Sequence, residues 1–299
     1  MRLLINLSIA LNLIRWKNLI FLALAQSIFY FFVLFPSLKF WQIHPSFNYL
    51  LIATISIAAA GYIINDCYDT ICDRINKPHK AYIDTKISRK SALYLYYLLN
   101  CIGIFAGIKL CMLLGENMYS FFFLSIVIAL YAYSKHLKKT PIIGNLLVSL
   151  LVTSNTLILY FFPFGNHGKD AVYVLQFAFF AFFINLLREM VKDLEDMNGD
   201  YNAGMYTLPI ILGKTRSIKI ILSISSLVSI LFMQFCIVQL DEKPYFQVGF
   251  LSGIIFPLFY FMFKIYLSKT QKHFHKMSLL LKGILMVGLL FISILCLIN

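Results

Sequence analysis

Apolar residues dominate long runs of this chain, and most of the charged residues lie in the short segments between them. The runs cover residues 17–35, 46–64, 91–113, 118–134, 141–162, 171–191, 217–238, 245–267 and 278–298. Runs of roughly 17 to 25 apolar residues are long enough to cross a bilayer as helices. Turn formers such as Pro36, Gly115 and Pro244 lie in the gaps. The pattern predicts an all-α bundle of nine transmembrane helices.

Composition supports a membrane protein. Hydrophobic residues make up 60% of the 299 residues, charged residues only 13%, and the mean hydropathy is +0.80. A soluble protein of this length exposes far more charge. We therefore expect one membrane-embedded domain over residues 1–299, with a central cavity open to the cytoplasm. A shorter apolar segment at the N-terminus stops at Arg15 and lacks a small-residue cleavage site. It predicts an interfacial helix before the first span.

The net charge of +13 does not indicate a nucleic-acid partner, because the basic residues lie in short loops between apolar runs. With nine spans, 22 of the 26 Lys and Arg residues fall on the side of the N-terminus. By the positive-inside rule that side is cytoplasmic. We therefore expect a cytoplasmic N-terminus and active site, an outside C-terminus, and residence in a bacterial or archaeal cell membrane.

Two short windows hold six Asp residues and one Glu, of the 13 acidic residues in the chain. NDCYDTICDRINKPHKA begins at Asn65, directly after the second apolar run, and KDLEDMNGDYNAG begins at Lys192, directly after the sixth. Both fall on the predicted cytoplasmic side. Acidic side chains at the ends of membrane helices are candidates for a functional site.

Helical periodicity gathers the acids of each window on one face. If the second span continues as a helix, Asn65, Asp66, Asp69 and Asp73 share a sector of about 100°. Asp193, Asp196 and Asp200 share a sector in the same way, and Glu195 points elsewhere. Facing carboxylates repel one another and need cations, and all-oxygen ligands suit Mg²⁺ or Ca²⁺. The spacing favours one metal per cluster with a diphosphate between them. The alternative is a set of helix-capping acids that meet the basic loops.

Basic residues near the clusters are candidates to hold the diphosphate. They are Lys77 and Lys80 after the first cluster, Lys135, Lys138 and Lys139 in YAYSKHLKKTPIIGN, and Arg15 near the first span. The alternative is that these residues only reflect membrane topology, because cytoplasmic loops are generally enriched in Lys and Arg.

These motifs, with nine spans, resemble the UbiA superfamily of intramembrane prenyltransferases over essentially the whole chain. RWKNLI, with Arg15 and Asn18, is similar to the Arg-x-x-Asn entry of that superfamily to its first helix. YSKHLKKTPIIGN, with Tyr133, Lys135 and Lys138, resembles its Tyr-Ser…Leu-Lys…Gly-Asn segment. REMVKDLEDMNGDYNAGMYTLPIILGK, with Lys192, resembles the digeranylgeranylglyceryl phosphate synthase branch. One departure is HKAYI, where Lys80 and Ala81 replace the usual Arg and Pro.

The resemblance implies an enzyme that transfers a prenyl group and releases diphosphate. It implies two Mg²⁺ ions and roles for three sets of residues. The catalytic acids are Asp69, Asp73, Asp193 and Asp196. The metal ligands are Asn65, Asp66, Asp69, Asp73, Asp193, Asp196 and Asp200. The substrate-binding residues are Arg15, Asn18, Lys77, Lys80, Tyr133, Lys135, Lys138 and Lys192.

The implied partners are a polyprenyl diphosphate donor, here geranylgeranyl diphosphate, a lipophilic acceptor and the membrane lipids, with no obligatory protein partner. The acceptor that the branch implies is the hydroxyl of a prenylglycerol phosphate, which gives an ether lipid. An aromatic acceptor of menaquinone-type or ubiquinone-type biosynthesis stays open. The alternative from another class is a cation transporter or channel, which predicts acids near the bilayer midplane on broken helices.

Overall fold

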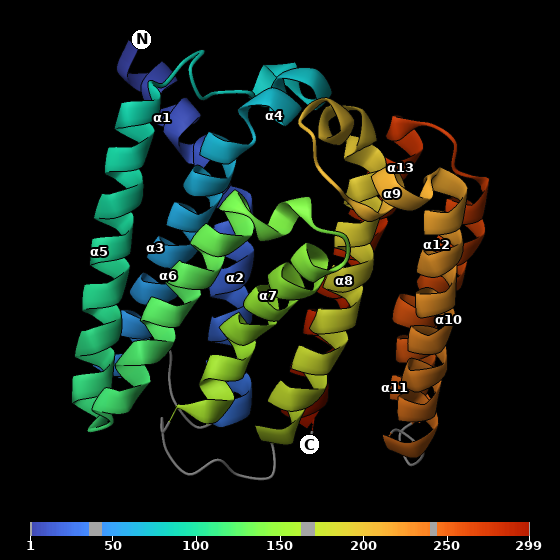
Figure 1. The fold of residues 1–299 in the computed structure, drawn as a ribbon. Coiled ribbons are helices and arrows are strands. Elements are labelled where there is room, and N and C mark those ends of the chain that lie inside the picture. The colour runs from blue at the N-terminus through green and yellow to red at the C-terminus, as the bar shows by residue number, and fades with distance from the viewer. Residues whose placement is uncertain (1, 36–43, 163–170, 240–243, 299) are drawn as a thin grey trace. The chain divides into compact units, whose positions relative to one another are not determined.

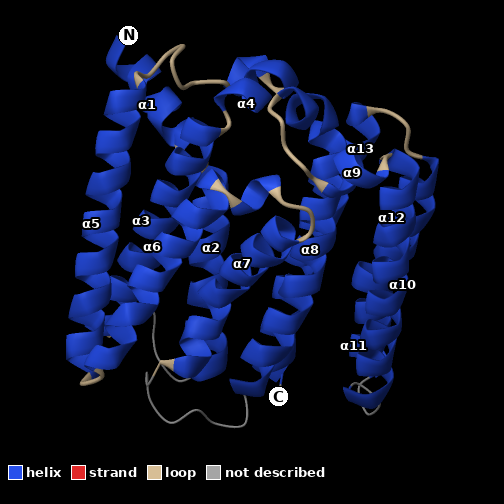
Figure 2. Cartoon of the chain, viewed as in Figure 1, coloured by secondary structure: helices blue, strands red, loops and turns tan. Residues whose placement is uncertain are grey.

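The computed structural model describes residues 2–35, 44–162, 171–239 and 244–298. This part of the chain is almost entirely helical and contains no β-strand (Figures 1 and 2). Its α-helices are α1 (Arg2–Leu13), α2 (Trp16–Ile28), α3 (Pro45–Tyr68), α4 (Thr70–Asn76), α5 (Arg89–Leu114), α6 (Ser120–Lys135), α7 (Ile143–Phe161), α8 (Ala171–Asn202), α9 (Leu208–Leu212), α10 (Lys214–Gln239), α11 (Pro244–Phe250), α12 (Phe256–Leu267) and α13 (Gln271–Ile298). The π-helices are η1 (Phe29–Leu34) and η5 (Leu251–Ile255), and the 3₁₀ turns are η2 (Pro78–Lys80), η3 (Asn117–Tyr119) and η4 (Leu137–Lys139).

Nine helical segments within the described residues are long and apolar enough to cross a membrane. They run over Trp16–Leu34, Pro45–Tyr68, Arg89–Leu114, Asn117–Lys135, Ile143–Phe161, Val172–Asn202, Lys214–Val238, Pro244–Leu267 and Gln271–Leu295. The expected all-α architecture with nine spans is therefore confirmed. The helix expected before the first span is α1.

The chain divides into two compact units, which we describe separately. The first comprises Met1–Lys138 and Asn155–Lys169, and the second comprises Lys139–Ser154 and Asp170–Asn299. The division passes through α7.

In the first unit α3 packs along α5 and α6 (Figure 1). Ser88 caps the N-terminus of α5, and Gly115 ends that helix with a positive φ of 73°. Glycines let the helices approach closely. A Cβ at Gly103 would lie 2.6 Å from Ile57, and one at Gly107 would lie 2.5 Å from Phe123. Small residues commonly serve this purpose between membrane helices.

The helix that carries the first acid cluster is interrupted at Asp69. Helix α3 ends at Tyr68, Asp69 lies outside helical geometry with φ −92° and ψ 8°, and α4 begins at Thr70. The expectation that the span simply continues through the cluster is therefore wrong in this detail. Main-chain hydrogen bonds nevertheless run from Asp69 to Asn65 (2.9 Å) and from Asp73 to Asp69 (2.8 Å). They keep the three side chains close to helical spacing.

In the second unit α8 is a single helix of 32 residues that extends well beyond the apolar run. It carries Asp193, Asp196 and Asp200 without a break, so the helical spacing assumed for the second cluster is correct. Helices α8 and α13 pack along each other (Figure 1). The predictions of one domain and of a central cavity stay predictions.

Candidate active site

The first acid cluster begins with an ion pair between Arg15 and Asp66. The Arg15 guanidinium donates a hydrogen bond of 2.8 Å to Asp66 Oδ1 and lies 5.0 Å from the ring centroid of Tyr62. Arg15 adopts a left-handed backbone, with φ 53° and ψ 51°, between α1 and α2. This conformation costs a non-glycine residue about 1 kcal/mol and often marks a functional position. The strained turn directs Arg15 towards the carboxylate.

Lys138 forms the second ion pair of this cluster, with Asp69. The ammonium of Lys138, in η4, contacts Asp69 Oδ2, and the Asp69 side chain is only 5% exposed. The Asn65 side chain donates a hydrogen bond of 2.6 Å to the same oxygen. Asp69 therefore receives a cation from a segment 69 positions away and an amide from one helical turn before it.

Burial and charge shift the pKa values of this cluster. Burial raises the pKa of Asp73 to about 6, and the neighbouring carboxylates of Asp69 and Asp66 add to the rise. Burial by itself would lower the pKa of the Lys138 ammonium, but Asp69 outweighs it and the net shift is upward. The pKa of Arg15 is raised in the same way, since Asp66 outweighs burial. Both cations therefore stay charged beside the acids.

The donor atoms of the first cluster fit Mg²⁺. They are all oxygens, and the amide oxygen of Asn65 is buried without a hydrogen-bond partner in the described structure. A buried oxygen in this state is costly unless it gains a partner. Within the described residues, no group of three or more His, Cys, Asp or Glu side chains is already close enough together to hold a metal ion. Arg15 and Lys138 neutralise two of the acids instead.

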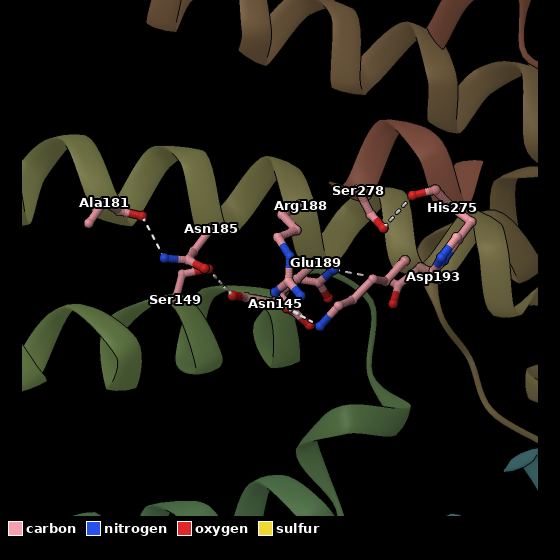
Figure 3. A network of polar contacts seen from close by, with 10 residues as sticks. Asn145, Ser149, Ala181, Asn185, Arg188, Glu189, Asp193, His275 and Ser278 are labelled. Atoms are coloured by element: carbon pink, nitrogen blue, oxygen red, sulfur yellow. Dashed lines mark hydrogen bonds and ion pairs between the residues drawn. The ribbon is translucent and has the colours of Figure 1, made fainter. Parts of the chain in front are cut away.

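The second cluster lies on α8 and is joined by hydrogen bonds to α7 (Figure 3). The Asn145 side chain donates a hydrogen bond of 2.9 Å to Asp193 Oδ2. The main-chain carbonyl of Asn145 in turn accepts a hydrogen bond of 2.7 Å from Ser149. Asn145 is 8% exposed. Its amide therefore fixes the orientation of the Asp193 carboxylate through Oδ2.

Two further acids of α8 are anchored to other elements. Asp200 is 4% exposed and accepts a hydrogen bond of 3.2 Å from the hydroxyl of Thr207, just before α9. Glu195 is 7% exposed and lies 3.0 Å from Nδ1 of His275 on α13. The helical spacing of the sequence directs Glu195 away from the face that carries the other acids. The structure pairs it with a histidine and buries it.

A basic group lies on α8 one turn before Asp193. Glu189 Oε1 accepts a hydrogen bond of 3.0 Å from Arg188 Nη1 and one of 2.5 Å from Lys192 Nζ (Figure 3). Nε of Arg188 is buried without a hydrogen-bond partner among the described residues. Two cations share one carboxylate here, so the three side chains together carry net positive charge.

The other expected substrate-binding residues lie near the first cluster or at its helix ends. The main-chain N–H of Asn18 donates a 2.8 Å hydrogen bond to the Arg15 carbonyl. Lys77 ends α4 and is half-buried. Lys135 ends α6, with its ammonium 5.5 Å from the Tyr131 ring centroid, and Tyr133 on the same helix is half-buried. Lys80 lies in η2, and its side chain is outside the described part of the structure.

Sequence reasoning did not single out Asn145 or Arg188 as site residues. Each of the two residues belongs to a motif that the sequence analysis quoted. Asn145 belongs to the Gly-Asn pair that ends YSKHLKKTPIIGN, and Arg188 opens REMVKDLED. What the sequence did not show is the partner of each side chain, since Asn145 and Asp193 are 48 positions apart.

Comparison with known proteins gives consistent results. Residues 19–294 match the model of the UbiA prenyltransferase family. The chain is 36% identical over 224 residues to digeranylgeranylglyceryl phosphate synthase of Sulfurisphaera tokodaii, covering 72% of this chain and 73% of the relative. It is 31% identical over 245 residues to the synthase of that name from Methanosphaera stadtmanae, covering 79% and 84%.

Solved structures share the fold. A structure from work on digeranylgeranylglyceryl phosphate synthase in membranes superposes with a TM-score of 0.71 at 25% identity, covering 98% of this chain and 99% of that one. A UbiA homologue from Archaeoglobus fulgidus bound to GPP and Mg²⁺ superposes with a TM-score of 0.63 at 15% identity, covering 95% and 99%. The family match and the apolar helices make the chain an integral membrane protein. The paired acid motifs, the spans and the family match together show that this chain belongs to the UbiA prenyltransferase family.

Proposed function

We propose that this prenyltransferase moves a geranylgeranyl group from its diphosphate to the hydroxyl of a prenylglycerol phosphate. The C1–O bond of the donor breaks, and its electron pair leaves with the diphosphate. A new bond forms between C1 and the acceptor oxygen, which loses its proton, and the product is an ether lipid. Support comes from relatives named digeranylgeranylglyceryl phosphate synthase at 31–38% identity.

The observation that carries this proposal is that one short segment serves both acid clusters. Lys138 pairs with Asp69 of the first cluster, and Asn145, seven positions later, bonds to Asp193 of the second. Each cluster is therefore held by a residue of the segment that runs from the end of α6 into the first turn of α7. A diphosphate bridged by cations is a ligand that two sets of carboxylates can share.

The residues proposed to hold Mg²⁺ are those expected from the sequence: Asn65, Asp66, Asp69, Asp73, Asp193, Asp196 and Asp200. When bound, Mg²⁺ supplies positive charge that stabilises the departing diphosphate. The chain adds its own cations. Arg15 and Lys138 are held beside the acids and stay charged, so they are placed to donate hydrogen bonds to diphosphate oxygens.

The acceptor phosphate has a separate candidate partner on α8. Arg188 and Lys192 share one carboxylate, and the buried Nε of Arg188 lacks an acceptor. Arginine suits phosphate because its donors form a planar fork. We assign the phosphate of the prenylglycerol phosphate to this group.

The proposed topology places both clusters and the N-terminus in the cytoplasm. This topology is supported by the positive-inside rule, because most Lys and Arg residues fall on the side of the N-terminus. The water-soluble part of the donor would then be reached from the cytoplasm, and its apolar tail would lie among the spans.

An assay with several acceptors tests the function. The purified chain is incubated in nanodiscs with Mg²⁺ and labelled geranylgeranyl diphosphate, together with a prenylglycerol phosphate, the same lipid without phosphate, or an aromatic acid. We expect an ether lipid only from the phosphorylated acceptor, and none after chelation of Mg²⁺. Prenylation of the aromatic acid alone would assign the chain to quinone biosynthesis. Cation flux in liposomes without any prenyl transfer would favour a transporter.

A further inference from the structure

The second unit contains a cavity far along α8 from the acid cluster. Its volume is about 280 Å³, and its walls come from α8, α10, α11, η5 and α13. Phe180, Phe232, Phe250 and Phe291 contribute aromatic surface to it. A cavity of roughly 150 Å³ lined by apolar side chains holds a benzene-sized ligand. This cavity therefore has room for a substantially longer apolar group.

One polar side chain lines this cavity. Gln176, on α8, has a buried amide oxygen with no hydrogen-bond partner among the described residues. Buried Gln26 in the first unit shows the usual state of such a group. Its amide donates to the Asn155 carbonyl at 2.9 Å and accepts from the Thr54 hydroxyl at 3.0 Å. A buried amide oxygen without a hydrogen-bond donor inside a membrane span is costly and is a sign of a ligand or a functional contact.

The cavity wall has an unusual backbone. Ile254 belongs to η5, the π-helix inserted between α11 and α12. Such inserts are rare and frequently occur at functional sites. On the opposite wall, a Cβ at Gly288 would lie 2.2 Å from Phe180, so only glycine lets that ring take its place. Both features shape the cavity independently of Gln176.

The cavity is distinct from the proposed diphosphate site. Gln176 precedes Asp193 by 17 positions on one continuous helix. At about 1.5 Å per residue the two lie about 25 Å apart along the axis. Among the described residues that line the cavity there is neither an acid nor a base, so it does not suit a phosphate or a metal.

We propose that this cavity binds an isoprenoid chain that carries a hydroxyl group. The hydroxyl donates a hydrogen bond to the Gln176 oxygen, and it also accepts, so it satisfies either atom of the amide. The flat alkene units of the chain pack against the aromatic rings through dispersion. The hydroxyl belongs either to a free prenyl alcohol or to a prenylglycerol. The site is separate from the proposed acceptor subsite on Arg188 and does not depend on it.

Photolabelling tests the proposal. The full chain in phosphatidylcholine nanodiscs is exposed to a prenyl alcohol bearing a diazirine, and labelled peptides are identified by mass spectrometry. We expect adducts on residues 175–180 and 250–254. The unlabelled prenyl alcohol or a prenylglycerol displaces the probe, and the stronger competitor identifies the source of the hydroxyl. A prenyl hydrocarbon of equal length competes about fivefold less, the contribution of one hydrogen bond.

Variants distinguish labelling that depends on the Gln176 amide from labelling by probe dissolved in the surrounding lipid. Gln176→Leu is expected to lower labelling about fivefold, as expected for one lost hydrogen bond. Gln234→Leu, which changes an exposed glutamine of α10, is the matched control and leaves labelling unchanged. Mg²⁺-dependent diphosphate release persists in Gln176→Leu, which separates this site from the proposed reaction. Equal competition by the hydrocarbon in the unmodified protein, or no adduct at these residues, would overturn the proposal.

Discussion

Asn145 donates a hydrogen bond of 2.9 Å to the carboxylate of Asp193, and the two residues belong to different helices, α7 and α8. A neutral amide therefore orients this acid of the second cluster. The first cluster is organised differently, because Lys138 and Arg15 bring full positive charges to Asp69 and Asp66. The two clusters therefore differ in charge balance, although their acid spacing is similar.

We predict that Asn145→Leu weakens donor binding without unfolding the protein. The substitution removes the amide that orients Asp193, and a lost hydrogen bond to a charged group costs about 1.5–3 kcal/mol. The KM for the prenyl diphosphate should rise at least tenfold in steady-state assays. Asn202→Leu changes an exposed asparagine of the same unit, and its KM should stay near that of the unmodified chain. Equal effects in the two variants would argue against a positioning role.

Asp69→Asn and Asp196→Asn should each abolish Mg²⁺-dependent diphosphate release. Each removes a proposed oxygen ligand with its negative charge, and the amide keeps nearly the same shape. Both proteins should still elute as folded material from size-exclusion chromatography in detergent. The control is Asp84→Asn at an exposed turn with φ 61°, a conformation that asparagine tolerates. Turnover near that of the unmodified protein in either cluster variant contradicts the metal role.

Lys138→Gln should reduce both stability and activity. It leaves the carboxylate of Asp69 buried without its cation, and such a loss costs about 3–5 kcal/mol at a fully buried pair. Lys138 is itself 24% exposed, so we expect the lower end of that range. Thermal unfolding followed by intrinsic fluorescence measures the loss. Lys90→Gln, at an exposed lysine of α5, is the control and should leave both the unfolding temperature and turnover unchanged.

Arg188→Gln should discriminate between the two substrates. We expect the KM for a phosphorylated acceptor to rise at least tenfold, because a charged hydrogen bond is lost, while the KM for the donor stays constant. Neither protein is expected to transfer the prenyl group to the same acceptor without phosphate. Arg216→Gln, at an exposed arginine, is the control. A rise in the donor KM instead would place Arg188 at the diphosphate.

Arg15→Gly tests whether the strained turn serves the site. Glycine adopts the left-handed backbone of residue 15 without strain, so the turn itself is relieved. The ion pair with Asp66 is lost at the same time. We expect reduced prenyl transfer with little change in unfolding temperature. Activity equal to that of the unmodified chain would show that Arg15 contributes only backbone geometry.

The sequence by itself determined the helical architecture, because each apolar run must satisfy its own backbone hydrogen bonds inside a membrane. It also located the acids, since charge is scarce in such a chain and stands out wherever it occurs. Local spacing was enough to align Asp193, Asp196 and Asp200 on one face of α8.

Tertiary structure alone decided the partners. It placed the break in the helix at Asp69. It also paired residues that lie far apart in the chain, namely Arg15 with Asp66, Lys138 with Asp69 and Asn145 with Asp193. No periodicity encodes such pairs, because they depend on which helices pack together and where each helix ends. The cavity beside Gln176 likewise arises only where α8, α10, α11, η5 and α13 meet. The missing partner of the Gln176 amide oxygen could be identified only from the positions of its neighbours.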